Sequence, residues 1–223
     1  MLAFDHIVVA SPQPKKAAEQ FANQHRLVHV EGGRHSNWGT YNSLCHLSNH
    51  VYIEWLGIEH PNTARHSHNP LIQHLHQSLQ DDPHTRPIQL AFRTTQLDNL
   101  IHHMNTEGIG YAGPFPGERQ KPDGSQLKWR MLFPQHSSSP GLLPFLIEWE
   151  GDHLPSDSTV VNDSVLKAVE LGVSAPAHSV QLFEQIYQLK FDSDRTSPAL
   201  ENGSLRINAG SDLRVQFSQF TLE

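Results

Sequence analysis

The segment Asp5-His6-Ile7-Val8-Val9-Ala10-Ser11-Pro12 predicts a buried strand that runs directly into a helix. Its apolar, β-branched run is typical of a strand, and a proline costs nothing in the first helical turn. Two later segments open in the same way: Ile88-Gln89-Leu90-Ala91-Phe92-Arg93-Thr94-Thr95 and Val169-Glu170-Leu171-Gly172-Val173-Ser174-Ala175-Pro176. The recurrence indicates three copies of one strand–helix unit within 223 residues.

The three units also close alike, on a triplet of a β-branched, a polar and an aromatic residue. These triplets are Ile53-Glu54-Trp55, Ile147-Glu148-Trp149 and Val215-Gln216-Phe217. Extended segments precede each of them, so we expect β-α-β-β-β modules and an α+β fold. The first two modules would pair into one cupped sheet, and the third would be partial.

This organisation predicts two parts of the chain. Residues 1–151 would hold two paired modules, at 4–58 and 87–151, joined by a helical connector at 59–86. Residues 165–223 would form the third module. In the connector, Asn69 and Pro70 come directly before an apolar face and mark the start of a helix.

Composition excludes several classes of function. The formal net charge of -7 argues against nucleic-acid binding, and no apolar run is long enough to cross a membrane. A single cysteine, Cys45, cannot form an internal disulfide, and the N-terminus lacks the basic start of a signal peptide. We therefore expect a cytoplasmic protein whose partner is a small molecule, with neither nucleic acid nor membrane as a partner.

Four polar residues stand at matched positions in otherwise apolar strands: His6 and Glu54 in the first module, Gln89 and Glu148 in the second. Side chains alternate along a strand, so each would point away from its module's helix and into the concave side of the sheet. One imidazole, one amide and two carboxylates would suit a divalent metal. Solvent exposure of each residue is the alternative. Asp5, next to His6, would point to the opposite face.

Several other residues are candidates for binding the substrate. Arg130 carries a guanidinium that matches a carboxylate or phosphate, although a structural ion pair explains it equally well. Thr40 and Asn42, in the turn that opens a strand, could donate hydrogen bonds to a ligand. His35 is expected in a glycine-flanked loop, where it could line the mouth of the pocket, although a plain loop residue is the simpler explanation. The histidines of the connector lack the spacing of a shared helical face, so we do not expect a metal there.

The pattern resembles the vicinal oxygen chelate superfamily, which includes glyoxalases, bleomycin-resistance proteins and extradiol dioxygenases. More narrowly, it resembles the glyoxalase-like, glyoxalase 3-type domains. The resemblance covers residues 3–150 well and the third module loosely. It rests on Asp5-His6, Gly32-Gly33-Arg34-His35, Gly39-Thr40-Tyr41-Asn42, Tyr52-Ile53-Glu54, Trp129-Arg130 and Leu143-Pro144-Phe145-Leu146-Ile147-Glu148-Trp149.

The resemblance implies a divalent metal (Zn, Ni, Mn or Fe) held by His6, Glu54, Gln89 and Glu148. A substrate with two neighbouring oxygens would chelate that metal, and Glu148 or Glu54 would move a proton as in a glyoxalase-type isomerase or lyase. Glu148 is the preferred base. Two alternatives stay open: a non-catalytic, resistance-type binding protein and a non-haem iron dioxygenase. The third module would cover a sheet edge or pair across a homodimer.

Overall fold

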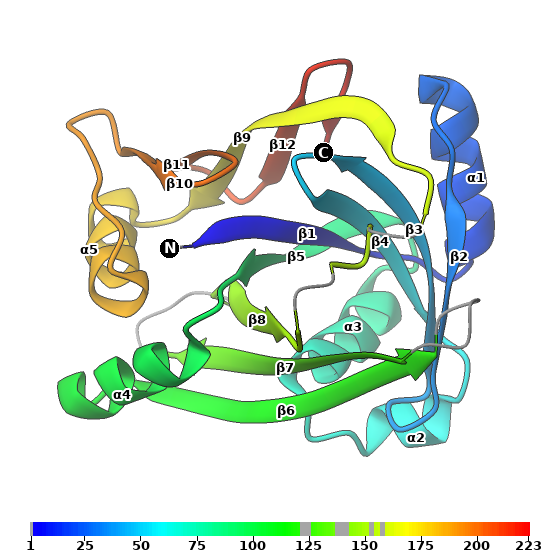
Figure 1. The fold of residues 1–223 in the computed structure, drawn as a ribbon, viewed down its shortest axis with the longest axis horizontal. Helices are drawn as coiled ribbons and strands as arrows, with labels where there is room; N and C mark the ends of the chain where they lie inside the picture. Colours follow the sequence, from blue (N-terminus) through cyan, green and yellow to red (C-terminus); the bar gives the residue numbers. More distant parts are fainter. Residues whose placement is uncertain (1, 121–125, 137–142, 152–153, 157–158) are drawn as a thin grey trace.

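A computed structural model describes residues 2–120, 126–136, 143–151, 154–156 and 159–223, and its ribbon is drawn in Figure 1. The first module follows the expected order. Its elements are β1 (Ala3–Ala10), α1 (Pro14–His25), β2 (Val30–His35), β3 (Thr40–Ser48) and β4 (Val51–Ile58). Strand β4 runs parallel to β1, and β3 and β2 follow antiparallel outside it. A proline does occupy the first turn of α1, but it is Pro14, two residues later than the predicted Pro12.

The second module repeats this arrangement after a helical connector. The connector holds α2 (Pro61–Arg65) and α3 (Pro70–Asp81), and the module is built from β5 (Arg86–Arg93), α4 (Leu97–Glu107), β6 (Gly110–Gln120), β7 (Gln126–Gln135) and β8 (Phe145–Trp149). Asn69 caps α3, because its side-chain oxygen accepts a hydrogen bond from the Leu71 amide at 2.9 Å. This contact confirms the start of the helix that the sequence predicts.

The third module departs from the predicted pattern at its end. It consists of β9 (Asn162–Val173), α5 (Pro176–Tyr187), β10 (Thr196–Leu200), β11 (Gly203–Ala209), β12 (Leu213–Phe217) and β13 (Thr221–Leu222). The strand parallel to β9 is β11, whereas β12 runs antiparallel to β9 on its other side. The triplet Val215-Gln216-Phe217 therefore does not correspond to Ile53-Glu54-Trp55, and the module is a partial copy followed by a hairpin.

The first two modules join through their opening strands, since β1 and β5 pair antiparallel. The resulting sheet runs in the order β10-β11-β9-β3-β4-β1-β5-β8-β7-β6 and curls strongly into a half-barrel (Figure 1). The expectation of an α+β fold with a cupped sheet is confirmed. Helix α3 lies across the concave side of this curl, next to β1, β4 and β5.

Two apolar clusters cover the two faces of the sheet. The larger one lies on the side of α1, α4 and α5 and includes residues of all three modules, among them Phe4, Trp55, Phe92, Tyr187 and Leu205. The smaller one lies inside the curl, and its members alternate along the strands with those of the larger cluster. Within the described ranges, no helix has the length and apolar character that a membrane span requires.

Candidate functional site

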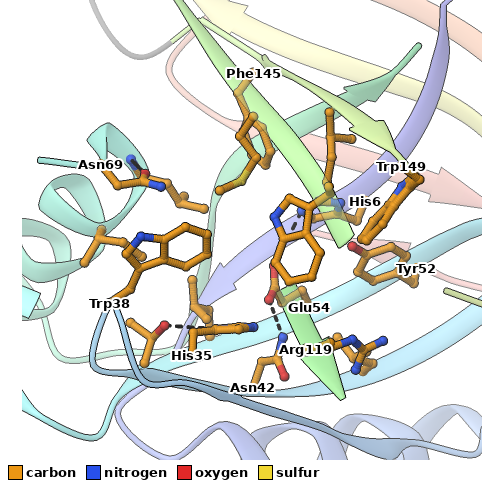
Figure 2. Close-up of a pocket in the computed structure, with 18 residues that line it drawn as sticks. His6, His35, Trp38, Asn42, Tyr52, Glu54, Asn69, Arg119, Phe145 and Trp149 are labelled. Carbon is orange, nitrogen blue, oxygen red and sulfur yellow. Dashed lines mark hydrogen bonds and ion pairs between the residues drawn. The ribbon is translucent and has the colours of Figure 1, made fainter. Parts of the chain in front are cut away.

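A pocket opens inside the curl, between the strands of the first module, those of the second and α3. It encloses about 530 Å³ of empty space, part of it open to solvent. Figure 2 shows the side chains that line it. The walls are mainly aromatic and aliphatic. Polar side chains also reach the same space, among them His6, His35, Thr40, Asn42, Glu54, Asn69 and Arg119.

His6 lies at the bottom of this pocket and is held by the residue before it. The Asp5 carboxylate lies 2.6 Å from Nδ1 of the His6 ring, and both residues are almost fully buried. The β1–β5 register shifts between Phe4 and His6, so strand alternation does not apply at this point. This bulge corrects the expectation that Asp5 points away from His6.

Three groups surround the Asp5 carboxylate and keep it ionised. Besides His6, the indole N–H of Trp149 donates to Asp5 at 2.9 Å, and Arg93 lies 3.6 Å away. Burial acts to raise the pKa of Asp5, but the hydrogen bond from His6 and the nearby positive charges outweigh burial, and the pKa lies below its ordinary value. An ionised Asp5 can only accept, so Nδ1 of His6 carries a proton and Nε2 faces the pocket.

Glu54 faces His6 from the neighbouring strand β4. Its Oε2 lies 3.5 Å from His6 Nε2, and its Oε1 accepts a hydrogen bond from the Asn42 side chain at 2.5 Å (Figure 2). The ring of Tyr52 stacks on the His6 ring with centroids 4.5 Å apart. A buried row of Asp5, His6 and Glu54 results, with Asn42 fixing its far end.

The structure also brings Thr40, Asn42 and His35 to the pocket. His35 ends strand β2, which corrects the expectation that it belongs to a loop. Its Nδ1 lies 3.0 Å from the Thr40 hydroxyl, so these two side chains hold one another in place. Burial lowers the pKa of His35, an effect that Glu54 opposes and Arg119 reinforces.

The other two residues expected to hold a metal lie elsewhere. The Gln89 side chain donates to the Leu143 carbonyl at 3.2 Å and accepts from the Leu90 amide at 2.9 Å. It lines a separate cavity beside Leu171 and Phe183 of the third module. The β1–β5 register shifts again next to Gln89, which disturbs the alternation on which the expectation was based.

Glu148 lies on the helix side of the sheet. On β8 the cup-facing residues are Phe145, Ile147 and Trp149, so Glu148 points to the opposite face. There it accepts from the Leu97 amide at the start of α4, at 3.0 Å, and pairs with Arg130. The four expected ligands therefore do not converge, because one triplet pattern takes opposite orientations in the two modules.

Arg130 is part of the same external cluster. Its guanidinium pairs with Asp98 at 3.0 Å and with Glu148, and these two hydrogen-bonded carboxylates raise its pKa. Of the two explanations that the sequence left open, the structure supports the ion pair. Arg130 is not among the residues that line the pocket of His6 and Glu54.

The donor set inside the pocket does not fit the implied divalent metal. His6 and Glu54 supply one nitrogen and one carboxylate, and the facing positions of β8 are apolar. Within the described parts of the chain, His, Cys, Asp and Glu side chains form no group of three or more that could hold a metal ion. An iron dioxygenase would need two histidines and a carboxylate on one ion. His6, His35 and Glu54 all line the pocket, but among the described residues they do not form such a group.

The sequence patterns did not identify two polar residues at or near the site. Arg119, on β6, lines the pocket and donates to the Gly32 carbonyl. His46, on β3, lies buried with its ring centroid 5.4 Å from that of Tyr52. Burial lowers the pKa of His46 to about 4, helped by Arg119 and opposed by Asp5. Neither residue belongs to a repeated motif. Arg119 reaches the pocket from β6 in the second module, and His46 pairs with Tyr52, which in turn pairs with His6.

Comparisons with known proteins agree with this architecture. The family model described as "Glyoxalase-like domain" matches residues 4–187. A search of curated proteins finds no match. A hypothetical protein from Staphylococcus aureus is 20% identical with a TM-score of 0.77, over 96% of this chain and 88% of its own.

A second solved structure shares the fold more distantly. It is a variant of methylmalonyl-CoA epimerase from Streptomyces coelicolor, in complex with 2-nitronate-propionyl-CoA. It is 16% identical with a TM-score of 0.51, over 70% of this chain and 100% of its own. The paired modules, the curled sheet and the family match over most of the chain lead to one conclusion: this chain belongs to the glyoxalase-like domain family.

Proposed function

We propose that this protein is a small-molecule isomerase or lyase in which Glu54 moves a proton to or from a substrate carbon. The observation that carries the proposal is the buried row of Asp5, His6 and Glu54 at the bottom of an aromatic pocket. Glu54 is only 7% exposed in a mainly apolar pocket, and a carboxylate in such a place is a suitable general base because little water competes for its lone pairs.

The surrounding residues give each group a distinct role. Asn42 holds one oxygen of Glu54, so the other oxygen stays directed toward His6 and the cavity. Asp5 fixes the His6 ring with Nε2 toward the cavity, so His6 can share a proton with an oxygen of the substrate beside the reacting carbon. Removal of the carbon proton by Glu54 would then create an enolate whose negative oxygen lies next to His6.

The proposal keeps the isomerase or lyase class of the superfamily and assigns the chemistry to side chains alone. Glu54 takes the place of Glu148 as the base, since Glu148 is used to bind Arg130 and the start of α4. The same fold carries an epimerase in Streptomyces coelicolor, so it accommodates isomerisation chemistry. No step requires Gln89, which lies against the third module.

Exchange of carbon-bound hydrogen for deuterium tests the proposal without knowledge of the product. A panel of small 2-hydroxy and 2-oxo acids, aldehydes and ketones is incubated with the protein in D₂O and followed by mass spectrometry. We expect at least one compound to gain deuterium with the native protein. The Glu54→Gln variant, which can still bond to Asn42, should lose at least 100-fold of that rate. An unchanged rate in this variant would contradict the role of Glu54.

A non-catalytic binding protein is the second candidate. It is favoured by the composition of the walls, where Trp38, Trp129 and Trp149 offer large apolar surfaces to a flat ligand. Compounds that quench the tryptophan fluorescence but never gain deuterium would support this candidate over the enzyme. Exchange that depends on Glu54 would support the enzyme.

A further inference from the structure

Arg119 contributes a positive charge to one side of the pocket. One of its N–H groups donates to the Gly32 carbonyl, which anchors the guanidinium, and no other hydrogen bond of its side chain to the described residues is seen. Among the described residues, no ion pair joins Arg119 to a carboxylate. Arginine is otherwise the residue that pairs most readily with planar oxyanions, so a lining guanidinium of this kind indicates an anionic ligand group.

Other groups near Arg119 do not replace its charge. Burial and the neighbouring guanidinium lower the pKa of His46 to about 4, and His35 is shifted in the same direction. Both imidazoles are therefore neutral near pH 7. Asp5 and Glu54 bring negative charge to the bottom of the pocket, so an anionic ligand needs Arg119 as its counter-charge.

Asn69 provides a second, independent feature on another wall. Its side-chain oxygen caps α3, but its side-chain N–H₂ group has no partner among the described residues although Asn69 is 1% exposed. A buried donor without a partner is costly, and a ligand oxygen would satisfy it. Asn69 and Arg119 lie on opposite sides of the pocket, with Trp38 and Glu54 between them (Figure 2).

We infer that the pocket binds a flat, mainly apolar carboxylic acid, with its carboxylate on Arg119 and a carbonyl or hydroxyl oxygen on Asn69. The inference deepens the proposed function, because such a ligand would place its middle carbons beside Glu54. The tryptophan walls would cover its apolar part.

Paired acids and amides test the charge requirement directly. Phenylacetate, mandelate and 2-naphthoate are each compared with the corresponding primary amide, and binding to the full chain is measured by tryptophan fluorescence and calorimetry at pH 7.5. We expect at least one acid to bind tenfold or more tightly than its amide. Arg119→Gln should remove that preference, and Arg119→Lys should keep part of it. Failure of every acid to outbind its amide, or a preference that survives Arg119→Gln, overturns the inference.

The Asn69 contact has its own matched pair of variants. Asn69→Asp and Asn69→Ser both keep an oxygen that can cap α3, and both remove the side-chain N–H₂ group. Aspartate has no donor, and serine keeps only a shorter hydroxyl. We expect mandelate to lose at least fivefold in affinity in each variant, with thermal stability close to that of the native chain. Unchanged affinity in both would remove Asn69 from the site. These measurements follow ligand binding, whereas deuterium exchange follows catalysis by Glu54. The ligand inference can therefore be wrong while the proposed function is right, and the proposed function can be wrong while the ligand inference is right.

Discussion

Asp5 has the largest structural role of any single polar residue in the pocket. Its carboxylate joins His6, Trp149 and Arg93, which come from β1, β8 and β5. Sequence alone could not assign this role, because strand alternation placed Asp5 and His6 on opposite faces. The bulge that brings them together depends on how β1 pairs with β5, which is a tertiary property.

Replacing Asp5 with Asn should destabilise the fold by about 3 kcal/mol at pH 7, because His6 and Arg93 would lose a buried counter-charge. Urea unfolding measures the change. The control is Asp98→Asn, which removes an exposed partner of Arg130 and should cost under about 1 kcal/mol.

Since the pKa of Asp5 is lowered in the fold, its contribution to stability is complete above about pH 4 and is lost as the pH falls further. If the difference in free energy of unfolding between the native chain and Asp5→Asn were the same at pH 3 as at pH 7, this role of the Asp5 carboxylate would be contradicted.

We expect His46 to cause a second pH dependence of stability, at higher pH than that of Asp5. Its pKa of about 4 lies below the ordinary value of a histidine, so below about pH 6.5 the unfolded chain takes up a proton that the fold resists. Stability should therefore fall between pH 6.5 and 4, by an amount on the order of 3 kcal/mol from this group. In His46→Gln that part of the fall should disappear in pH-dependent urea unfolding, whereas the exposed His102→Gln should retain it. If the free energy of unfolding changed equally with pH in the two variants, the fall in stability could not be assigned to His46.

The strands show how far sequence patterns determine a site. Repetition of the strand–helix segments predicted the order of the elements and the cupped sheet. The triplets Ile53-Glu54-Trp55 and Ile147-Glu148-Trp149 look identical in pattern. Yet Trp55 packs on the helix side, and Trp149 faces the cup and donates to Asp5. A shift of one residue reverses every side chain of a strand, and the register of β8 is set by contacts with β5 and β7 that the pattern does not contain.

The turn between β10 and β11 connects the third module to the first. The Asn202 side chain accepts from the Phe4 amide at 2.8 Å and donates to the Phe4 carbonyl at 2.9 Å and the Asn49 carbonyl at 3.0 Å. Asn202→Ala would leave these backbone groups without partners and should destabilise the chain by about 2 kcal/mol in urea unfolding. Glu201→Ala, at the exposed neighbouring position, should have little effect. Equal stability of the two variants would show that the turn does not hold the modules together.

At the scale of the whole molecule, the larger apolar cluster joins all three modules. Phe92 of the second module packs against Tyr187 of the third, with ring centroids 5.3 Å apart. Gly203 leaves no room for a side chain, because an added Cβ would lie 2.6 Å from Leu166 and 3.3 Å from Phe4. Residues 1–151 and 165–223 are therefore parts of a repeated sequence pattern that share one apolar core. Because they share this core, we expect both parts to unfold together.

Hydrogen exchange during urea unfolding tests this cooperativity. All four tryptophans lie in the first two modules, so their fluorescence reports on that part alone. Mass spectrometry of peptides from residues 162–223 reports on the third module. We expect both signals to change at the same urea concentration. A third module that loses protection well before the fluorescence changes would indicate two independent domains.

We propose that Glu54, and not Glu148, is the carboxylate that acts on the substrate. Once a compound that exchanges its carbon-bound hydrogen has been found, the most direct test compares its exchange rate in Glu54→Gln and Glu148→Gln. Each glutamine preserves size and an accepting oxygen, so the two variants differ chiefly in which carboxylate is lost. We predict a loss of at least 100-fold for Glu54→Gln and a rate within about threefold of the native rate for Glu148→Gln. The opposite result would contradict the account.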